Sequence, residues 1–157
     1  LGVPVHCSDE AVHELLATGG AGVAPVAERF PEAYHPRQKN IDRAVLGSLV
    51  FNDPAARQAL EALLHPLVHA SQDEFLRQNA RAHAPLVCLD IPLLYETGAE
   101  ARVDKVIVVT APSFIQRQRV LKRPGMNAEK FRSILALQMS DAEKRRHADY
   151  VVQTGLG

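Results

Sequence analysis

Short apolar runs alternate with longer helical segments along the chain, and this alternation limits the possible folds more than any other feature. The expected strands are residues 3–7, 86–91, 105–110 and 150–152, and helical signals fill most of the intervals between them. Residues 30–40, which are rich in Pro and polar side chains, are expected to be a loop. Strands that are continuously apolar and separated by helices are typical of a parallel sheet covered on both faces. We therefore predict an α/β fold.

Local capping signals predict where several helices begin. Asp53 followed by Pro54 is a strong helix start, because Asp caps the first turn and Pro fits its first position. Asn127 is expected to cap a later helix, and Ser140 with Glu143 has the spacing of a capping box.

Composition and charge exclude some classes of function. With 157 residues, 46% of them hydrophobic, the chain can form one domain with its own core. Eighteen Lys and Arg balance eighteen Asp and Glu, so the basic surplus of a nucleic-acid-binding protein is missing. No apolar run approaches the ~18 residues of a membrane span. Cys7 and Cys88 lie outside any CxxC pattern, so we expect buried, reduced thiols and a cytoplasmic protein.

Polar residues follow each expected strand at the point where the strand ends. Asp9 follows the first strand, Asp90 to Glu96 the second, Thr110 to Pro112 the third, and Thr154 with Gly155 the fourth. In parallel sheets, ligands bind beyond the carboxyl ends of the strands. The sequence therefore predicts the functional site at this edge.

Two carboxylates at this edge allow both a structural and a chemical interpretation. Asp9 is expected to cap the following helix, to act as a general base, or to do both with its two oxygens. Asp90 closes four apolar residues, which is the Walker B pattern for holding Mg²⁺ directly or through water. Any buried strand can also end in Asp, so this pattern alone is weak.

Basic and imidazole side chains give two further candidate binding sites. Gln116, Arg119 and Arg123 are three and four residues apart, which predicts one shared helix face. That face is either solvated or binds a polyphosphate through charge-assisted hydrogen bonds. His65 and His69 have a spacing that suits zinc, but no third ligand is evident, so we expect structural or substrate-contacting roles instead.

The ordered set of segments resembles the dephospho-coenzyme A kinase family. The resemblance is carried by LGVPVHCSDEAVHELL, by IDRAVLGSLVFNDPAARQALEALLHPLV, by IPLLYETG, by VDKVIVVTAP and by ILALQMSDAEKRRHADYVV. These segments span almost the whole chain in the family's order. The resemblance implies a P-loop kinase-like, three-layer fold in a single domain. Residues 19–82 would form its helical, CoA-side region, and residues 112–147 its lid and flanking helices.

The resemblance also implies a reaction and its site residues. The family transfers a phosphoryl group from ATP, with Mg²⁺, to the ribose 3′-hydroxyl of dephospho-CoA. Asp9 would be the catalytic base, Arg119 a catalytic and ATP-binding residue, and Asp90 the metal ligand. Further ATP-binding residues would be Arg123, Thr154 and Gly155. Residues on the acceptor side would be Arg43, His65, Pro92, Leu93 and Glu96.

Three departures from the family pattern qualify this picture. Cys7 stands where the family has the first Asp of a triplet, and Thr154 stands where it has Asn. The family's phosphate-binding loop is missing, since Gly19 and Gly20 follow a helix and no Lys-Ser/Thr comes after them. We expect that loop and its strand roughly 15 to 20 residues before Leu1, and a further helix after the chain's last residue.

In the family that the chain resembles, the strand before the phosphate-binding loop is central in the sheet, so a chain without it would differ in two respects. The 157 residues alone are expected to lack kinase activity and to dissolve poorly, because strand edges would be exposed. Two alternatives to the main interpretation stay open at this point: another small P-loop kinase of nucleosides or nucleotides, and a non-catalytic CoA- or nucleotide-binding module. The sequence does not determine the oligomeric state.

Overall fold

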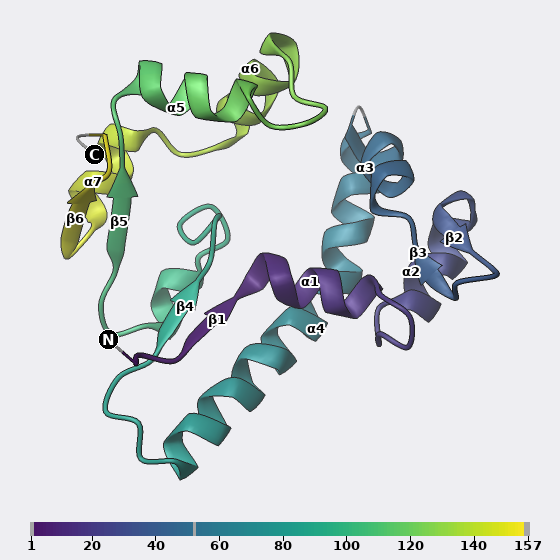
Figure 1. Cartoon of the computed structure of the whole chain (residues 1–157), viewed down its shortest axis with the longest axis horizontal. Coiled ribbons are helices and arrows are strands. Elements are labelled where there is room, and N and C mark those ends of the chain that lie inside the picture. Colours follow the sequence, from purple (N-terminus) through teal and green to yellow (C-terminus); the bar gives the residue numbers. More distant parts are fainter. Residues whose placement is uncertain (1, 52, 156–157) are drawn as a thin grey trace. The chain divides into compact units, whose positions relative to one another are not determined.

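A computed structural model of the chain describes residues 2–51 and 53–155. It divides into two compact units, Leu1–Pro92 and Leu93–Gly157, which run from purple to teal and from teal to yellow in Figure 1. Each unit contains one pair of parallel strands and its own helices. The predicted combination of parallel strands and helices is therefore present in both.

The first unit is built on the parallel pair β1 (Val5–Cys7) and β4 (Cys88–Asp90), with Cys7 opposite Asp90. Helix α1 (Ser8–Leu16) continues directly from β1 (Figure 1). The carboxyl end of β1, the start of α1 and Asp90 consequently lie at one edge of this strand pair.

Between α1 and the long helix of this unit lie α2 (Val23–Arg29), a 3₁₀ turn η1 (Pro31–Ala33), β2 (Tyr34–His35), β3 (Asn40–Ile41) and α3 (Arg43–Phe51). The prediction of a plain loop over residues 30–40 is wrong, because β2 and β3 pair there as an antiparallel hairpin. Lys39, with φ of 52°, makes the turn, and its N–H donates to the His35 carbonyl at 2.7 Å. Two residues per strand are too few for an alternating pattern to be visible in the sequence.

The long helix α4 (Pro54–Arg81) begins where the sequence predicted. The Asp53 carboxylate accepts hydrogen bonds from the Ala55 and Ala56 N–H groups at 2.9 and 3.0 Å. The helix continues through Pro66 to its end. Because it is long, it contacts α1, α2 and α3 along its length.

One apolar core holds the four helices of the first unit together. Val26 of α2 is fully buried, and Leu16 of α1, Leu46 of α3 and Leu64 of α4 are each less than a tenth exposed. Residues from all four helices thus fix α1 and α3 relative to one another. This packing determines where polar side chains on those two helices can meet.

The second unit contains η2 (Ala99–Arg102), β5 (Ile107–Thr110), α5 (Ser113–Leu121), α6 (Ala128–Leu137), α7 (Asp141–His147) and β6 (Tyr150–Gln153). Strands β5 and β6 are parallel, with Thr110 opposite Gln153. The predicted caps are confirmed: the Asn127 side chain accepts from the Lys130 N–H at 2.8 Å, and Ser140 and Glu143 form a reciprocal capping box.

The prediction that the strands are buried is wrong for several of their side chains. Leu86 is 63% exposed, Ile107 59% and Val109 65%, and the Cys88 thiol is exposed as well. Within residues 2–51 and 53–155, each parallel pair consists of two strands, so outward faces and outer edges have little to cover them. Over the same residues, no helix is both long and apolar enough to cross a bilayer.

Candidate functional site

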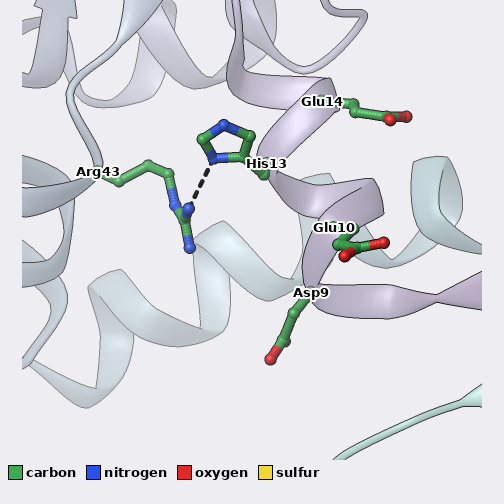
Figure 2. A pocket seen from close by; sticks show the side chains of 5 residues that line it. All are labelled: Asp9, Glu10, His13, Glu14 and Arg43. Atoms are coloured by element: carbon green, nitrogen blue, oxygen red, sulfur yellow. Dashed lines mark hydrogen bonds between the residues drawn. The ribbon is translucent and has the colours of Figure 1, made fainter. Parts of the chain in front are cut away.

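A pocket of about 370 Å³ opens beside the start of α1 in the first unit. Its lining residues are Asp9, Glu10, His13, Glu14 and Arg43 (Figure 2). Two of them, Asp9 and Arg43, were predicted as site residues from different segments of the sequence. The fold brings both to one pocket at the carboxyl end of β1.

Asp9 is the second residue of α1 and does not cap it. The residue at the cap position is Cys7, and no side chain makes a capping hydrogen bond there. The interpretation of Asp9 as a helix cap is therefore wrong, because the helix begins one residue before it. The Asp9 side chain is exposed and has no hydrogen bond or ion pair in the part of the chain that the structure describes. A carboxylate at a helix N-terminus is electrostatically favourable, and here it is available to a ligand.

His13 is a pocket residue that the sequence analysis missed. An Arg43 Nη1 group donates to His13 Nδ1 at 2.7 Å, as the dashed line in Figure 2 shows. Because a guanidinium only donates, His13 accepts through Nδ1 in this arrangement. The bond holds the Arg43 guanidinium at the pocket, while the Glu10 and Glu14 carboxylates point away from it. The only available signal was that His13 lies four residues after Asp9, on the same helix face.

Asp90 is the last residue of β4 and is exposed. Its position opposite Cys7, two residues before Asp9, puts two carboxylate-bearing residues at the same edge of the strand pair. Mg²⁺ commonly takes one or two protein carboxylates and completes its shell with phosphate oxygens and water. Among the described residues, no group of three or more His, Cys, Asp or Glu could hold a metal ion. This donor set fits a magnesium ion shared with a nucleotide, not one held by protein ligands alone.

The second unit brings two predicted ATP-binding residues into direct contact. The Arg119 guanidinium on α5 donates through Nη2 to the Thr154 carbonyl at 2.7 Å and through Nη1 to Thr154 Oγ1 at 3.3 Å. Gln116, on the same helix, donates to the Ala111 carbonyl at 2.7 Å and to Asp141 at 3.3 Å. Gln116 and Arg119 thus pack against the residues that follow β5 and β6, but the predicted face shared with Arg123 is wrong, because α5 ends at Leu121, before that residue.

Arg123 and Gly155 occupy different surroundings. Arg123 lies just beyond the end of α5, and its side chain is exposed to solvent. A Cβ atom on Gly155 would stand 2.5 Å from Cδ of Pro112, the residue before α5. Gly155 therefore allows the chain after β6 to pass close to the start of α5.

Glu96 of the predicted acceptor segment is bound to α7. Its Oε1 atom accepts from Lys144 Nζ and from the Met139 N–H, both at 2.8 Å, and the Glu96 and Lys144 side chains are only 15% and 19% exposed. Burial acts to raise the pKa of the Glu96 carboxyl. The hydrogen bonds, led by that of Lys144, outweigh burial and hold the pKa below its ordinary value.

We expect Glu96→Gln to lower the free energy of unfolding by about 2 kcal/mol at pH 7, because it removes the ionic bond to Lys144. Since the folded-state pKa is lowered, this stabilisation is complete above about pH 4.3 and is lost as the pH falls through the lower folded-state value. Urea unfolding of both proteins between pH 3 and 7 should show the difference narrowing in acid. Glu100→Gln, at an exposed position on η2, is the matched control. A difference in the free energy of unfolding between the two proteins that stays constant down to pH 3 would contradict this assignment.

The remaining predicted acceptor residues are not gathered into the pocket. His65 is exposed on α4, where its ring stacks on that of His69 with centroids 6.3 Å apart. Pro92 and Leu93, also exposed, follow β4 in the turn that leads to Glu96. The described pocket lining contains none of these three.

Comparisons with known proteins agree on one family. The family model described as dephospho-CoA kinase matches residues 1–156. A dephospho-CoA kinase of Mesorhizobium japonicum is 53% identical over 156 residues, which cover 99% of this chain and 77% of that protein. A dephospho-CoA kinase of Paramagnetospirillum magneticum is 52% identical over 145 residues, which cover 92% of this chain and 68% of that protein.

Solved structures show the same fold. A crystal structure of a Thermus thermophilus protein is similar with a TM-score of 0.79 at 36% identity, covering 98% of this chain and 76% of that one. Dephospho-CoA kinase from Campylobacter jejuni is similar with a TM-score of 0.70 at 26% identity, covering 99% of this chain and 78% of that one. The predicted α/β, P-loop kinase-like fold is thereby confirmed.

Proposed function

The chain belongs to the dephospho-CoA kinase family, and on this premise we propose which of its residues carry out the family's reaction. The function is ATP-dependent phosphorylation of dephospho-CoA to coenzyme A, the last step of coenzyme A biosynthesis. The observation that supports our assignment of residues most directly is the pocket at the end of β1. It is lined both by the Asp9 carboxylate, which is available to a ligand, and by the Arg43 guanidinium, which is held by His13.

Asp9 is the general base of this proposal. Its carboxylate takes the proton from the ribose 3′-hydroxyl as that oxygen attacks the γ-phosphorus of ATP, and ADP leaves. Its place in the first turn of α1, exposed and without a protein partner among the described residues, supports this role. A base must reach the hydroxyl it deprotonates, and a carboxylate tied up as a helix cap would be less available.

Arg43 binds the acceptor in this proposal. Its guanidinium has five N–H donors, of which one is used by His13, so the others can bind a phosphate or a ribose oxygen of dephospho-CoA. His65, Pro92 and Leu93 contribute on the same substrate side, with residues 19–82 as the helical CoA-side region. Glu96 supports this side indirectly, since its carboxylate is already bound to α7.

The ATP side of the proposal consists of Arg119, Arg123, Thr154 and Gly155. Residues 112–147, which include helices α5, α6 and α7, form the lid and its flanking helices. Arg119 lies near the end of α5 and Arg123 two residues beyond that end, and both exposed guanidinium groups can approach an anionic polyphosphate. Thr154 and Gly155 lie at the carboxyl end of β6, where ligands of parallel sheets bind.

Asp90 would hold Mg²⁺ together with the phosphates of ATP. Bound there, the ion would neutralise negative charge on the transferred group. The exposed carboxylate at the end of β4, at the same edge as the start of α1, supports this assignment.

The reaction itself is tested with the protein as its gene encodes it. We expect dephospho-CoA and ATP with Mg²⁺ to give coenzyme A and ADP in equal amounts, measured by chromatography of both products. Adenosine and deoxyadenosine serve as alternative acceptors, and phosphorylation of either in preference to dephospho-CoA would instead indicate a nucleoside kinase. Binding of dephospho-CoA without any turnover would indicate a non-catalytic binding module.

A further inference from the structure

Arg119 is anchored to the carboxyl end of β6 by one residue, Thr154. One hydrogen bond runs to the Thr154 carbonyl at 2.7 Å and a second to Thr154 Oγ1 at 3.3 Å. The two contacts use different guanidinium nitrogens, Nη2 and Nη1, so they fix the orientation of the guanidinium plane as well as its position.

The Thr154 hydroxyl is itself held in place. It donates its proton to the Thr110 carbonyl at 3.0 Å, which leaves its lone pairs to accept from Arg119. The same carbonyl accepts the Thr154 N–H at 2.9 Å, as the parallel pairing of β5 and β6 continues past the last strand residue. Thr110 is only 4% exposed, so the hydroxyl is tied to a buried part of the strand pair.

Neighbouring contacts keep α5 from moving away from this anchor. The Thr110 hydroxyl donates to the Asp141 carboxylate at the start of α7, and Gln116 of α5 donates to the same carboxylate oxygen. The close approach of Gly155 to Pro112 holds the chain after β6 against the start of α5. Arg119 is therefore an exposed arginine on a helix whose first turns are fixed.

Two of the five guanidinium N–H donors of Arg119 are used by Thr154, and the rest remain for an anion. A long side chain that is already oriented loses less conformational freedom when it binds a phosphate. The Thr154 hydroxyl has no proton left to donate to a nucleotide base, because that proton is bound to the Thr110 carbonyl.

We infer that Thr154 is a positioning residue, whose hydroxyl orients Arg119 toward the phosphates of ATP. The inference rests on the proposed role of Arg119, and it gives the Thr154 side chain the task of orienting Arg119 in place of a direct contact with ATP. The structural basis of this assignment is the pair of hydrogen bonds that the Thr154 hydroxyl makes, one to the Thr110 carbonyl and one from Arg119.

The test is a double-mutant cycle in the protein as its gene encodes it. Thr154→Val removes the hydroxyl and keeps the branched shape, so we expect kcat at saturating ATP to fall about tenfold, the loss of one charge-assisted hydrogen bond. Thr154→Ser retains a hydroxyl and should restore kcat to within about twofold. The dissociation constant for dephospho-CoA should remain unchanged in both variants. Ser133→Ala, which removes an exposed hydroxyl from α6, is the matched control.

The decisive comparison is made in the Arg119→Ala background. There Thr154→Val should cause no further loss of kcat, because the residue it positions is gone. If the fold-losses of kcat in the two single variants multiply in the double variant, the inference is overturned. It is also overturned if Thr154→Val keeps the wild-type kcat while Arg119→Ala loses much of it. An undiminished kcat of Arg119→Ala would instead refute the proposed role of Arg119, and the inference with it. If Thr154→Val unfolds at a lower temperature than the wild type, Thr154→Ala removes the same hydroxyl without added bulk, and the same expectations apply.

Discussion

Asp9→Asn should lower kcat by about 10²- to 10⁴-fold while ATP still binds, because the amide cannot take a proton from the ribose 3′-hydroxyl. The substitution keeps the size of the side chain, and Asp9 makes no hydrogen bond in the described part of the chain, so the fold loses no contact. The measurement is steady-state kinetics with both substrates saturating, together with the dissociation constant of ATP.

The control for Asp9→Asn is Glu28→Gln, which also removes one exposed carboxylate from a helix of the first unit. That variant should retain the wild-type kcat. A loss of less than fivefold in Asp9→Asn would remove Asp9 from catalysis, and its position in the first turn of α1 would then be a favourable charge at a helix N-terminus and no more.

Features encoded by neighbouring residues could be predicted from the sequence. The starts of α4, α6 and α7 follow from Asp53, Asn127 and Ser140, because a capping side chain binds an N–H only two or three residues further on. The same reasoning failed at α1, where the helix begins at Ser8 and leaves Asp9 inside its first turn. An error of one residue in a helix boundary was enough to change the interpretation of that carboxylate.

The pocket could be predicted only in part. Asp9 could be identified because it lies two residues after an apolar strand, whereas Arg43 was identified only through the family resemblance. His13 belongs to no motif, and its bond to Arg43 joins residues 30 positions apart in the sequence. That contact exists because buried leucines and valines pack α1 and α3 into one core, which no local pattern specifies.

In the second unit, the sequence predicted Arg119 and Thr154 as site residues but not the contact between them. Arg119 and Thr154 were both predicted to bind ATP, but their contact with each other, between residues 35 positions apart, was not predicted. Parallel pairing of β5 with β6 brings Thr154 and Gly155 beside α5. A contact of this kind depends on strand order and register, so it follows from the tertiary structure and not from residue spacing.

Arg119→Ala should lower kcat by about 10²- to 10³-fold, the usual cost of removing one oriented donor from a developing negative charge. Turnover at limiting ATP should fall far more than the affinity for dephospho-CoA, which calorimetry measures separately. Arg123→Ala should also reduce ATP-dependent turnover but by a smaller factor, because its side chain is exposed and must be ordered when ATP binds.

Arg117→Ala separates a specific role of Arg119 from the general effect of positive charge on α5. Arg117 lies two residues before Arg119 on the same helix and is also exposed, so both substitutions remove one charge from nearly the same place. Residues two apart on a helix point in different directions, however, and only Arg119 is bound to Thr154. If long-range charge alone mattered, the two variants would lose similar activity and the loss would shrink at high salt. A large loss in Arg119→Ala beside a near-wild-type Arg117→Ala, retained at high salt, would identify a directed contact with the phosphates.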